Sequence, residues 1–397
     1  MSRDFSERQA LIALNMTQGM GAITAKNLIE FFGSASEIFK ASPEDLARVR
    51  GIGKTSAAAF AEAFSRVDPA AEEERASRCS AAIITWDDPD YPARLKDIYD
   101  PPLVLYICGD RKVFSRTGVA IVGTRNATRY GCETAFRFGY QLASTGYAIV
   151  SGMARGIDTE GHRGAVEAHG ITIGVLGGAL DKFYPAENRK LAHRVIDEGG
   201  AIISEYPFGR EPDRQTFPMR NRIVSGLSAG VLVVEAATAS GTMITVDQAL
   251  EQGRAVMAVP GRVDSPTSQG CHKLIRNGAR LVTCADDVID ELGTFLASAR
   301  PADGKLHLDT EAPLQRPADV PALSDEERRI IDAINGEERF VDDLVASTGI
   351  EAGRLNGLLV ALQIKRFVKL LPGGVVTPMA VEKTFAASGS PSRKAHI

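Results

Sequence analysis

The sequence has few of the residues that cross-link a chain or anchor it in a membrane. Its cysteines are odd in number, widely spaced and without a C-x-x-C pair, so neither a disulfide framework nor a zinc site is indicated: they are Cys79, Cys108, Cys132, Cys271 and Cys284. No apolar run approaches the roughly 20 residues that span a bilayer, and no basic stretch followed by an apolar one begins the chain. These absences predict a protein of the reducing cytoplasm without a membrane partner.

An excess of positive charge is also missing. With 46 Lys and Arg against 50 Asp and Glu, the formal net charge is -4, so any contact with nucleic acid has to come from a local basic patch. The 397 residues, 44% of them hydrophobic, are enough for two or three domains with their own cores. The G-x-G-x-x-G fingerprint follows none of the predicted strands, so we expect no dinucleotide cofactor.

Residues 1–75 contain an internal repeat of the form G-x-G-x3-A-x2-apolar. Its two copies begin at Gly19 and Gly51. The glycines allow a tight turn between two helices, while the alanine and the apolar residue pack the second helix. The repeat resembles paired helix-hairpin-helix units and predicts a helical, SAM-like domain. Contact with the DNA backbone and a purely structural role both remain open.

Residues 76–295 alternate short β-rich runs with patterned helical stretches. The runs are LVLYICG (103–109), GVAIVGT (118–124), YAIVSG (147–152), ITIGVLGG (171–178), GAIISEY (200–206), GVLVVEA (230–236) and AVMAVPG (255–261). This alternation predicts parallel strands with crossover helices, a Rossmann-like doubly wound α/β sheet that is mostly parallel. Ligands of such sheets bind beyond the carboxyl ends of the strands.

Arginines gather in the loops that follow these strands: Arg125, Arg129, Arg155, Arg210, Arg214, Arg220 and Arg222. The segment FPMRNRIVSGLS adds Phe217, and an aromatic ring beside guanidinium groups can hold bases and phosphates of a single strand. The alternative is a core Phe217 with solvated arginines. The turn Ser240-Gly241-Thr242 opens a helix whose free amide groups would suit an anion.

Seven segments follow one another over roughly residues 118 to 280: GTRNATRYG, VSGMARGID, VLGGALDKFYPAEN, SEYPFG, FPMRNRIVSGLS, VVEAATASGTMIT and VPGRVDSPTSQGCHKLIRNGA. Together they resemble the DNA-processing protein A family, also called DprA or Smf. The resemblance implies a non-catalytic, cytoplasmic protein that binds single-stranded DNA, forms a homodimer, and delivers the strand to the recombinase RecA during natural transformation.

The resemblance also implies a DNA path along Arg125 and the Ser151-Gly152 turn, completed by Arg214, Phe217 and the run Arg220-Asn221-Arg222. Together with the loop analysis, the expected DNA-binding residues are Arg125, Ser151, Gly152, Arg155, Arg214, Phe217, Arg220, Asn221, Arg222, Ser240, Gly241 and Thr242. The chain departs from the family at Met219, where a basic residue is more usual. That departure removes one possible phosphate contact.

Two pairs of polar residues could be given a sharper chemical role. Asp158 and His162 stand four residues apart, but no third metal ligand is in view, so a helix cap and a packed histidine are favoured. Glu205 and Glu235 both close buried strands, where anchoring a neighbouring loop is favoured over acid–base catalysis. We therefore expect no metal and no catalytic residue.

Residues 296–321 are rich in proline, alanine and charge and are interpreted as a linker. Residues 322–380 predict three helices and a hairpin, which resembles a winged helix. Its expected recognition helix carries Arg354 and Asn356, but Glu351 and other acidic residues oppose them, so contact with protein or with DNA is possible. Residues 381–397 have no core-forming pattern and are interpreted as a disordered tail.

An alternative from another class is a nucleotide-processing enzyme, such as a phosphoribohydrolase, on a related Rossmann-like sheet. That class carries a P-G-G-x-G-T run followed by a catalytic glutamate. The comparable stretch here is TASGTMITVDQALE, which lacks the Pro-Gly-Gly and has Asp247 and Glu251 at unproven positions. The sequence favours the single-strand binder.

Overall fold

The computed structural model describes residues 4–298, 324–334, 339–364, 367–371 and 375–378. The chain divides into two compact units between residues 306 and 307. The expected disordered tail lies outside the described residues, and so does the expected linker apart from residues 296–298, which end a helix. None of the described helices has the length and apolar character that crossing a membrane requires.

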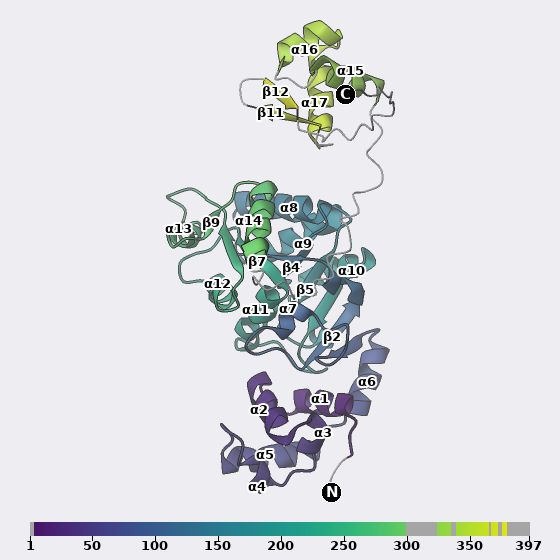
Figure 1. Cartoon of the computed structure of the whole chain (residues 1–397), viewed down its shortest axis with the longest axis vertical. Helices are drawn as coiled ribbons and strands as arrows, with labels where there is room; N and C mark the ends of the chain where they lie inside the picture. Colours follow the sequence, from purple (N-terminus) through teal and green to yellow (C-terminus); the bar gives the residue numbers. More distant parts are fainter. Residues whose placement is uncertain (1–3, 299–323, 335–338, 365–366, 372–374, 379–397) are drawn as a thin grey trace, which may run out of the picture. The chain divides into compact units, whose positions relative to one another are not determined.

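A nine-stranded sheet forms the centre of the first unit (Figure 1), with the strand order β1-β2-β6-β5-β4-β3-β7-β8-β9. All neighbours from β6 to β9 pair in parallel, whereas β2 pairs with β6 and β1 with β2 in antiparallel fashion. The predicted Rossmann-like, mostly parallel sheet is therefore confirmed. The strands are β1 (Ala82–Thr85), β2 (Val104–Gly109), β3 (Gly118–Val122), β4 (Ala148–Ser151), β5 (Thr172–Val175), β6 (Ala201–Ser204), β7 (Ser228–Val233), β8 (Ala255–Ala258) and β9 (Arg280–Leu281).

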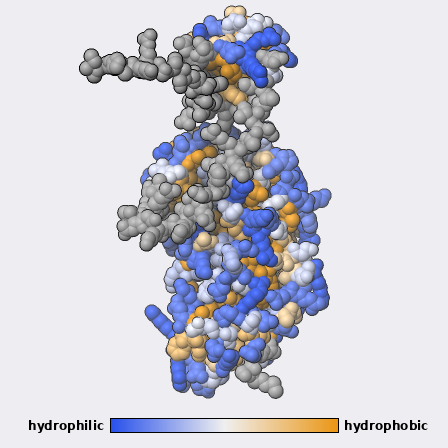
Figure 2. Space-filling view, turned by 45° about the vertical axis from the view of Figure 1, so that its right-hand side comes forward, coloured by the Kyte–Doolittle hydropathy of each residue, from blue (hydrophilic) through white to orange (hydrophobic). Residues whose placement is uncertain are grey.

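Helices cover both faces of this sheet. Ile223, Val246 and Leu274 pack from α11, α12 and α13 into one core, while Phe138 and Leu292 pack from α8 and α14 into another. The helices are α7 (Ala93–Lys96), α8 (Arg129–Ser144), α9 (Ile157–Glu167), α10 (Arg189–Asp197), α11 (Thr216–Gly226), α12 (Gly241–Glu251), α13 (Gln269–Arg276) and α14 (Ala285–Ser298). On the face seen in Figure 2, hydrophobic residues reach the surface only in scattered areas among hydrophilic ones.

Six helices precede the sheet: α1 (Glu7–Met16), α2 (Ala22–Phe32), α3 (Ala35–Ile38), α4 (Pro43–Leu46), α5 (Lys54–Phe64) and α6 (Pro69–Arg78). Both repeat copies place a glycine with positive φ before a helix, with φ of 79° at Gly19 and 88° at Gly51. The core of these helices continues into the sheet, because it includes Tyr106 of β2 and Phe208. The helical segment and the sheet thus share one hydrophobic core.

The second unit contains α15 (Asp325–Ile334), β10 (Arg339–Phe340), α16 (Val341–Thr348), α17 (Ala352–Ile364), β11 (Val368–Leu371) and β12 (Val375–Pro378). Its strands form an antiparallel sheet in the order β10-β12-β11. Ile330, Leu344, Leu359 and Val376 from the helices and sheet form its core. Three helices against a small sheet are the predicted winged-helix arrangement.

Candidate nucleic-acid interface

The candidate site is a shallow pocket at the carboxyl ends of β3, β4 and β5. Its lining comes from the loops after these strands and from the first turns of α11. The cavity measures about 30 Å³, which leaves room for only a few water molecules. A nucleotide can therefore lie only across its mouth. The lining residues are Arg125, Gly152, Ala154, Arg155, Tyr184, Pro185, Phe217 and Arg220.

Five of the twelve predicted DNA-binding residues meet in this pocket, because neighbouring parallel strands bring their following loops to one edge of the sheet: Arg125, Gly152, Arg155, Phe217 and Arg220. Two glycines allow these loops to approach. A Cβ atom at Gly156 would lie 2.4 Å from the carbonyl oxygen of Thr124, and one at Gly152 would lie 2.4 Å from Nη2 of Arg220. A side chain at either position would push the loops apart.

Arg220 is buried at the base of the pocket, with 4% of the residue exposed. Its Nη1 donates hydrogen bonds to the carbonyl oxygens of Gly152, at 2.7 Å, and of Val175. Burial lowers the pKa of the guanidinium to about 10, so it still carries its charge at neutral pH. Arg220 therefore joins the ends of β4 and β5 to α11 and supplies positive charge from below the surface.

Asp158 binds backbone amide groups at and after the Ser151-Gly152 turn, where the family resemblance implies part of the DNA path. Its Oδ2 accepts hydrogen bonds from the N–H groups of Gly152, at 3.1 Å, and Ala154, at 3.3 Å. Burial raises the pKa of this carboxyl group, and the charge of Arg220 opposes the rise. Gly152 thus lines the pocket without offering its amide group, and Asp158 acts as an anchor of the loop.

Arg125 and Phe217 form the exposed part of the pocket. The guanidinium carbon of Arg125 lies 5.1 Å from the centroid of the Phe217 ring, over its face. Arg125 is exposed, and within the described ranges no carboxylate pairs with it. A Cβ atom at Gly177 would lie 2.7 Å from Cδ1 of Phe217, so the ring rests directly on the end of β5. The site therefore offers a solvent-facing cation held by an aromatic ring.

Arg155 is the second exposed cation of the pocket, and it already has a partner. Its Nε pairs with Oε1 of Glu187, and both side chains are about half exposed. The hydrogen bond that Arg155 donates to Glu187 raises the pKa of Arg155, and the pKa of Glu187 is lowered in turn. A phosphate group would therefore compete with Glu187 for this guanidinium.

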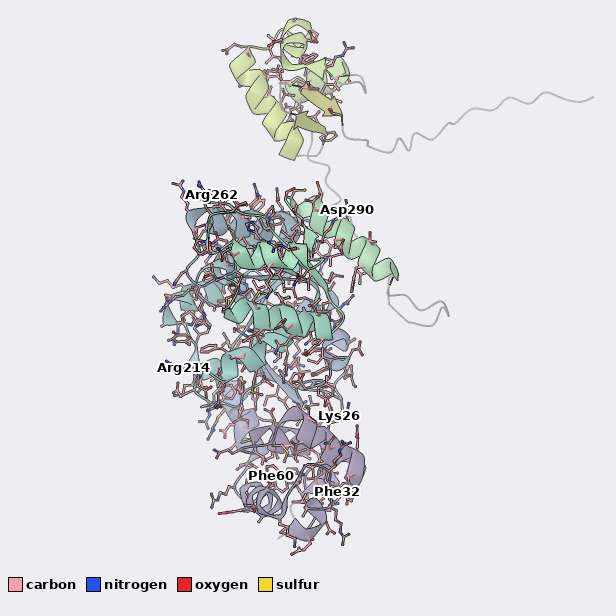
Figure 3. The ribbon with its side chains drawn as sticks, turned by 90° about the vertical axis from the view of Figure 1, so that its left-hand side faces the viewer. Lys26, Phe32, Phe60, Arg214, Arg262 and Asp290 are labelled. Carbon is pink, nitrogen blue, oxygen red and sulfur yellow. The ribbon has the colours of Figure 1, made fainter. Side chains whose placement is uncertain are left out.

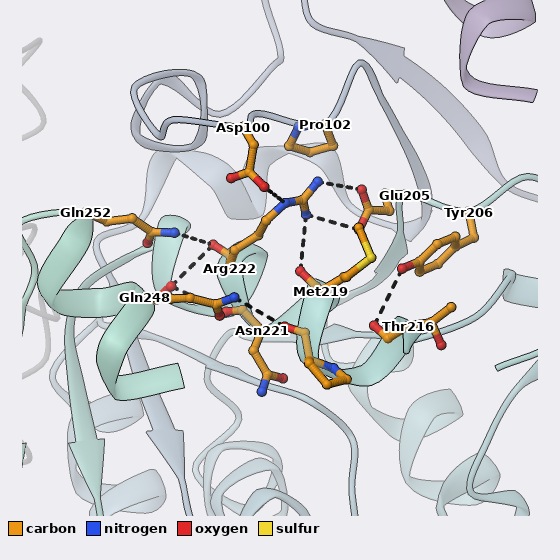
Figure 4. A network of polar contacts seen from close by, with 12 residues as sticks. Asp100, Pro102, Glu205, Tyr206, Thr216, Met219, Asn221, Arg222, Gln248 and Gln252 are labelled. Carbon is orange, nitrogen blue, oxygen red and sulfur yellow. Dashed lines mark hydrogen bonds and ion pairs between the residues drawn. The ribbon is translucent and has the colours of Figure 1, made fainter. Parts of the chain in front are cut away.

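The structure does not place Arg222 in the pocket. Figure 4 shows it between two carboxylates, where Nε donates to Asp100 at 2.8 Å and Nη2 donates to Glu205 at 2.6 Å. Only 4% of the residue is exposed. Two carboxylates already satisfy this guanidinium, so the expected role in phosphate binding is replaced by anchoring α11 to the chain around Asp100 and to the end of β6.

The remaining predicted residues also lie outside the pocket lining: Ser151, Arg214, Asn221, Ser240, Gly241 and Thr242. Ser151 is buried and donates its hydroxyl hydrogen bond to the carbonyl of Ile121 at 2.6 Å. Asn221 accepts a hydrogen bond from Nε of Arg220 at 3.2 Å. Arg214 lies at the outer edge of the molecule just before α11 (Figure 3), while Ser240 and its neighbours begin α12.

The other carboxylates and the histidine behave as structural groups. Glu235 accepts hydrogen bonds from the backbone N–H and the hydroxyl group of Thr128, at 2.9 and 2.6 Å. His162 is buried, with Nδ1 2.7 Å from the hydroxyl oxygen of Thr172. In the part of the chain that the structure describes, no cluster of three or more His, Cys, Asp or Glu side chains could hold a metal ion.

Sequence reasoning missed Tyr184 and Glu187. Both lie in the segment after β5, within the stretch FYPAEN that contributed to the family resemblance. Tyr184 lines the pocket, whereas its neighbour Phe183 lines a separate cavity on the side of α10. Nothing in the pattern shows which of two adjacent aromatic residues turns toward the site, because the loop has no regular period.

The fold and the pocket define a class of Rossmann-like proteins that present guanidinium groups and aromatic rings at the strand ends in place of a dinucleotide fingerprint. Residues 82–293 match the family model of DNA recombination-mediator protein A, and residues 314–374 match that of the DprA winged helix domain. The chain belongs to this DprA, or Smf, family.

Individual relatives agree with this assignment. Protein Smf of Synechocystis is 34% identical over 390 residues, covering 93% of this chain and 98% of the relative. DNA processing protein DprA of Bacillus subtilis is 45% identical over 203 residues, covering 51% of this chain and 68% of the relative. The crystal structure of DprA from Streptococcus pneumoniae is similar with a TM-score of 0.64 and 33% identity, covering 73% of this chain and 99% of that one.

Proposed function

We propose that this protein binds single-stranded DNA across the mouth of the pocket, as a binding protein without catalytic activity. The observation that carries the proposal is the exposed guanidinium of Arg125, which lies 5.1 Å from the ring centroid of Phe217 in a pocket that Tyr184 and Arg155 also line. Guanidinium groups hold phosphates and aromatic rings stack on bases of any sequence. Membership of the DprA family supports the same reading.

The preference for a single strand follows from the rings. A base can stack on a protein side chain only when it is not already stacked inside a duplex, and phosphate contacts alone would not distinguish the two forms. The affinity is expected to fall steeply as the salt concentration rises. Protein binding releases cations that are condensed on the DNA, and added salt opposes this release.

The test is a salt titration of binding by the full chain to a fluorescent oligothymidine strand and to a blunt duplex of the same length. The proposal expects tighter binding to the strand and a steep salt dependence. Equal affinity for both forms, or an affinity that does not change with salt, contradicts it.

Incubation of the full chain with a nucleoside monophosphate, followed by chromatography of the free base, tests the alternative of a nucleotide-processing enzyme. The proposal expects no release of the base from the monophosphate. Asp158, whose carboxylate binds the N–H of Gly152 in the pocket, also binds the N–H of Ala154, which favours a structural role for this side chain. If the wild type releases the base and Asp158→Asn does not, the proposed function is wrong and the protein is a nucleotide-processing enzyme.

Two further features of the proposal rest on the family rather than on the pocket. They are a homodimer and delivery of the strand to the recombinase RecA in natural transformation. The division into residues 1–75, 76–295 and 322–380, with a linker at 296–321 and a tail at 381–397, rests on the sequence pattern. Sedimentation of the full chain tests the dimer. Recombinase filament formation on strands coated with a single-strand-binding protein, with and without this chain, tests the delivery.

A further inference from the structure

Tyr184 is the most exposed aromatic side chain of the pocket lining. It is 46% exposed, and its ring centroid lies 5.8 Å from that of Phe217, with the ring planes tilted by 50°. Phe217 is only partly exposed and its ring is already covered, because Arg125 lies over its face and the end of β5 lies against it at Gly177. The two rings thus differ in the surface that they leave for a ligand.

Stacking of a base needs a ring face that solvent alone occupies. On Phe217, a base would have to displace the guanidinium of Arg125 and lose its attraction to the ring. On Tyr184, a base meets no such competitor among the contacts of the described residues. From this difference we propose that Tyr184 stacks a nucleobase of the bound strand, whereas Phe217 supports Tyr184 and holds Arg125 toward the phosphates.

The charges around Tyr184 agree with this division of roles. Arg155 lines the same pocket as Tyr184 and lies close enough for the phenol to affect its pKa. Arg125 lies over the ring of Phe217, which in turn contacts Tyr184. A base on Tyr184 therefore has two cations in the same pocket for the neighbouring phosphates. Because every base has a stacking face, the contact gives affinity without sequence preference.

The inference rests on the proposed function, and one set of measurements separates the two. The full chain and the variants Tyr184→Phe and Tyr184→Ala are titrated with oligothymidine and with an abasic strand of the same length. Tyr140→Ala serves as the matched control, since Tyr140 is 44% exposed on α8, contacts Phe136 and does not line the pocket. Thermal unfolding of each variant checks that the fold is kept.

We expect Tyr184→Ala to weaken binding of oligothymidine by roughly 5- to 150-fold, the range measured for loss of one stacked base. Tyr184→Phe and Tyr140→Ala bind like the wild type, and on the abasic strand Tyr184→Ala binds like the wild type too. An equal loss on both strands, or no loss on either, overturns the role of Tyr184 while the proposed function stands. A wild type that binds neither strand overturns both.

Discussion

At the scale of single residues, the arginines of the site divide by what already surrounds them. Arg125 is exposed and free of carboxylates among the described residues, Arg155 is paired with Glu187, and Arg220 is buried against backbone carbonyls. Equal charges in the sequence therefore have unequal roles. We therefore expect Arg125 to contribute most to phosphate binding, Arg155 less and Arg220 least.

Arg125→Ala is expected to weaken binding of single-stranded DNA and to lower the slope of log affinity against log salt by about one unit, because one phosphate contact is lost. Arg129→Ala is the control at the start of α8, just after the loop of Arg125, since Arg129 is 92% exposed at its side chain and pairs with Glu133. Salt-titrated fluorescence anisotropy measures both. An unchanged slope in Arg125→Ala removes it from the phosphate path.

Glu187→Gln is expected to raise the affinity for single-stranded DNA, because the phosphate no longer competes with a carboxylate for Arg155. Glu133→Gln, which frees Arg129 outside the pocket, controls for the change in net charge. The comparison is made at one fixed salt concentration. If both variants gain equally, the effect is one of overall charge and Arg155 is not a phosphate ligand.

Arg220→Ala is expected to destabilise the fold and also to weaken DNA binding. The sequence suggested only a direct contact between Arg220 and phosphate. Its removal leaves the carbonyls of Gly152 and Val175 without a donor and the Asp158 carboxyl without the neighbouring charge. Loss of one partner of buried charged groups costs about 3–5 kcal/mol. Urea unfolding measures this, and a variant as stable as the wild type contradicts the anchoring role.

At the scale of elements, α11 is the part of the site that most depends on its neighbours. Arg222 joins it to Asp100 and Glu205. Gln248 of α12 and Gln252, the residue that follows α12, donate hydrogen bonds to the carbonyls of Pro218 and Arg222 (Figure 4). These contacts hold the helix that carries Phe217 and Arg220. The helix is thus positioned by Arg222 and by the residues of and after α12, while its residues Phe217 and Arg220 line the pocket.

Arg222→Ala is expected to lower the free energy of unfolding by about 3–5 kcal/mol, because it leaves two carboxylates without their shared cation. Arg214→Ala, at an exposed position before α11, leaves stability unchanged and at most weakens DNA binding. Denaturant unfolding and anisotropy are measured on both. A reversed pattern would return Arg222 to the binding surface.

The contact between α9 and β5 makes stability depend on pH. Burial lowers the pKa of His162 to about 3, from an ordinary value of 6.5. Below pH 6.5 the histidine of the unfolded chain takes up a proton, while His162 of the folded protein stays neutral until about pH 3. The free energy of unfolding is therefore highest above pH 6.5. It falls by about 1.4 kcal/mol per pH unit as the pH drops from 6.5 toward 3. In His162→Gln this part of the pH dependence disappears. Unfolding curves between pH 7.5 and 4.5 that run parallel for both proteins contradict it.

At the scale of the whole molecule, hydrogen bonds as well as the chain itself join the N-terminal helices to the sheet. Glu72 of α6 accepts a hydrogen bond from the N–H of Phe208 at 2.8 Å, and Asn15 of α1 donates one to the carbonyl of Glu205 at 3.0 Å. Both contacts reach the loop after β6, whose residue Glu205 also holds Arg222. The helices before the sheet therefore support the loop that leads into α11.

A fragment of residues 1–298 is expected to bind single-stranded DNA with the affinity and salt slope of the full chain, because the pocket lies wholly within it. A fragment of residues 80–298 exposes the core around Tyr106 and Phe208 and unfolds at a lower temperature. Calorimetry and anisotropy compare the two. Loss of binding in a folded 1–298 fragment would move the site into the second unit.

The second unit shows why its partner cannot be assigned from sequence. Arg354, on the expected recognition helix, pairs with Glu326 of α15 through Nη2 at 2.7 Å. The charge of Arg354 is therefore already paired with a carboxylate, as the charge of Arg155 is. Contact with DNA and contact with protein both remain predictions for this unit.

The sequence by itself determined most of the sheet, because buried parallel strands are short apolar runs ended by glycine or polar residues. All seven such runs form strands, although one of them, β2, is antiparallel to its neighbours. The sequence missed β1 and β9, of four and two residues, because edge strands so short have too few residues to show a pattern. The sequence also predicted the site at the carboxyl ends of the strands, because ligands of doubly wound sheets bind at that edge. The family could be named for the same reason, because its motifs occupy those loops.

Only the tertiary structure decided what each side chain of the site does. Arg220 and Arg222 are two residues apart on one helix, yet one lies beneath the pocket and the other between two carboxylates that come from distant parts of the chain. Tyr184 faces the pocket while Phe183 faces another cavity. The physical reason is that charge and aromatic character belong to the residue, whereas burial, pairing and free surface depend on neighbours that only folding brings together.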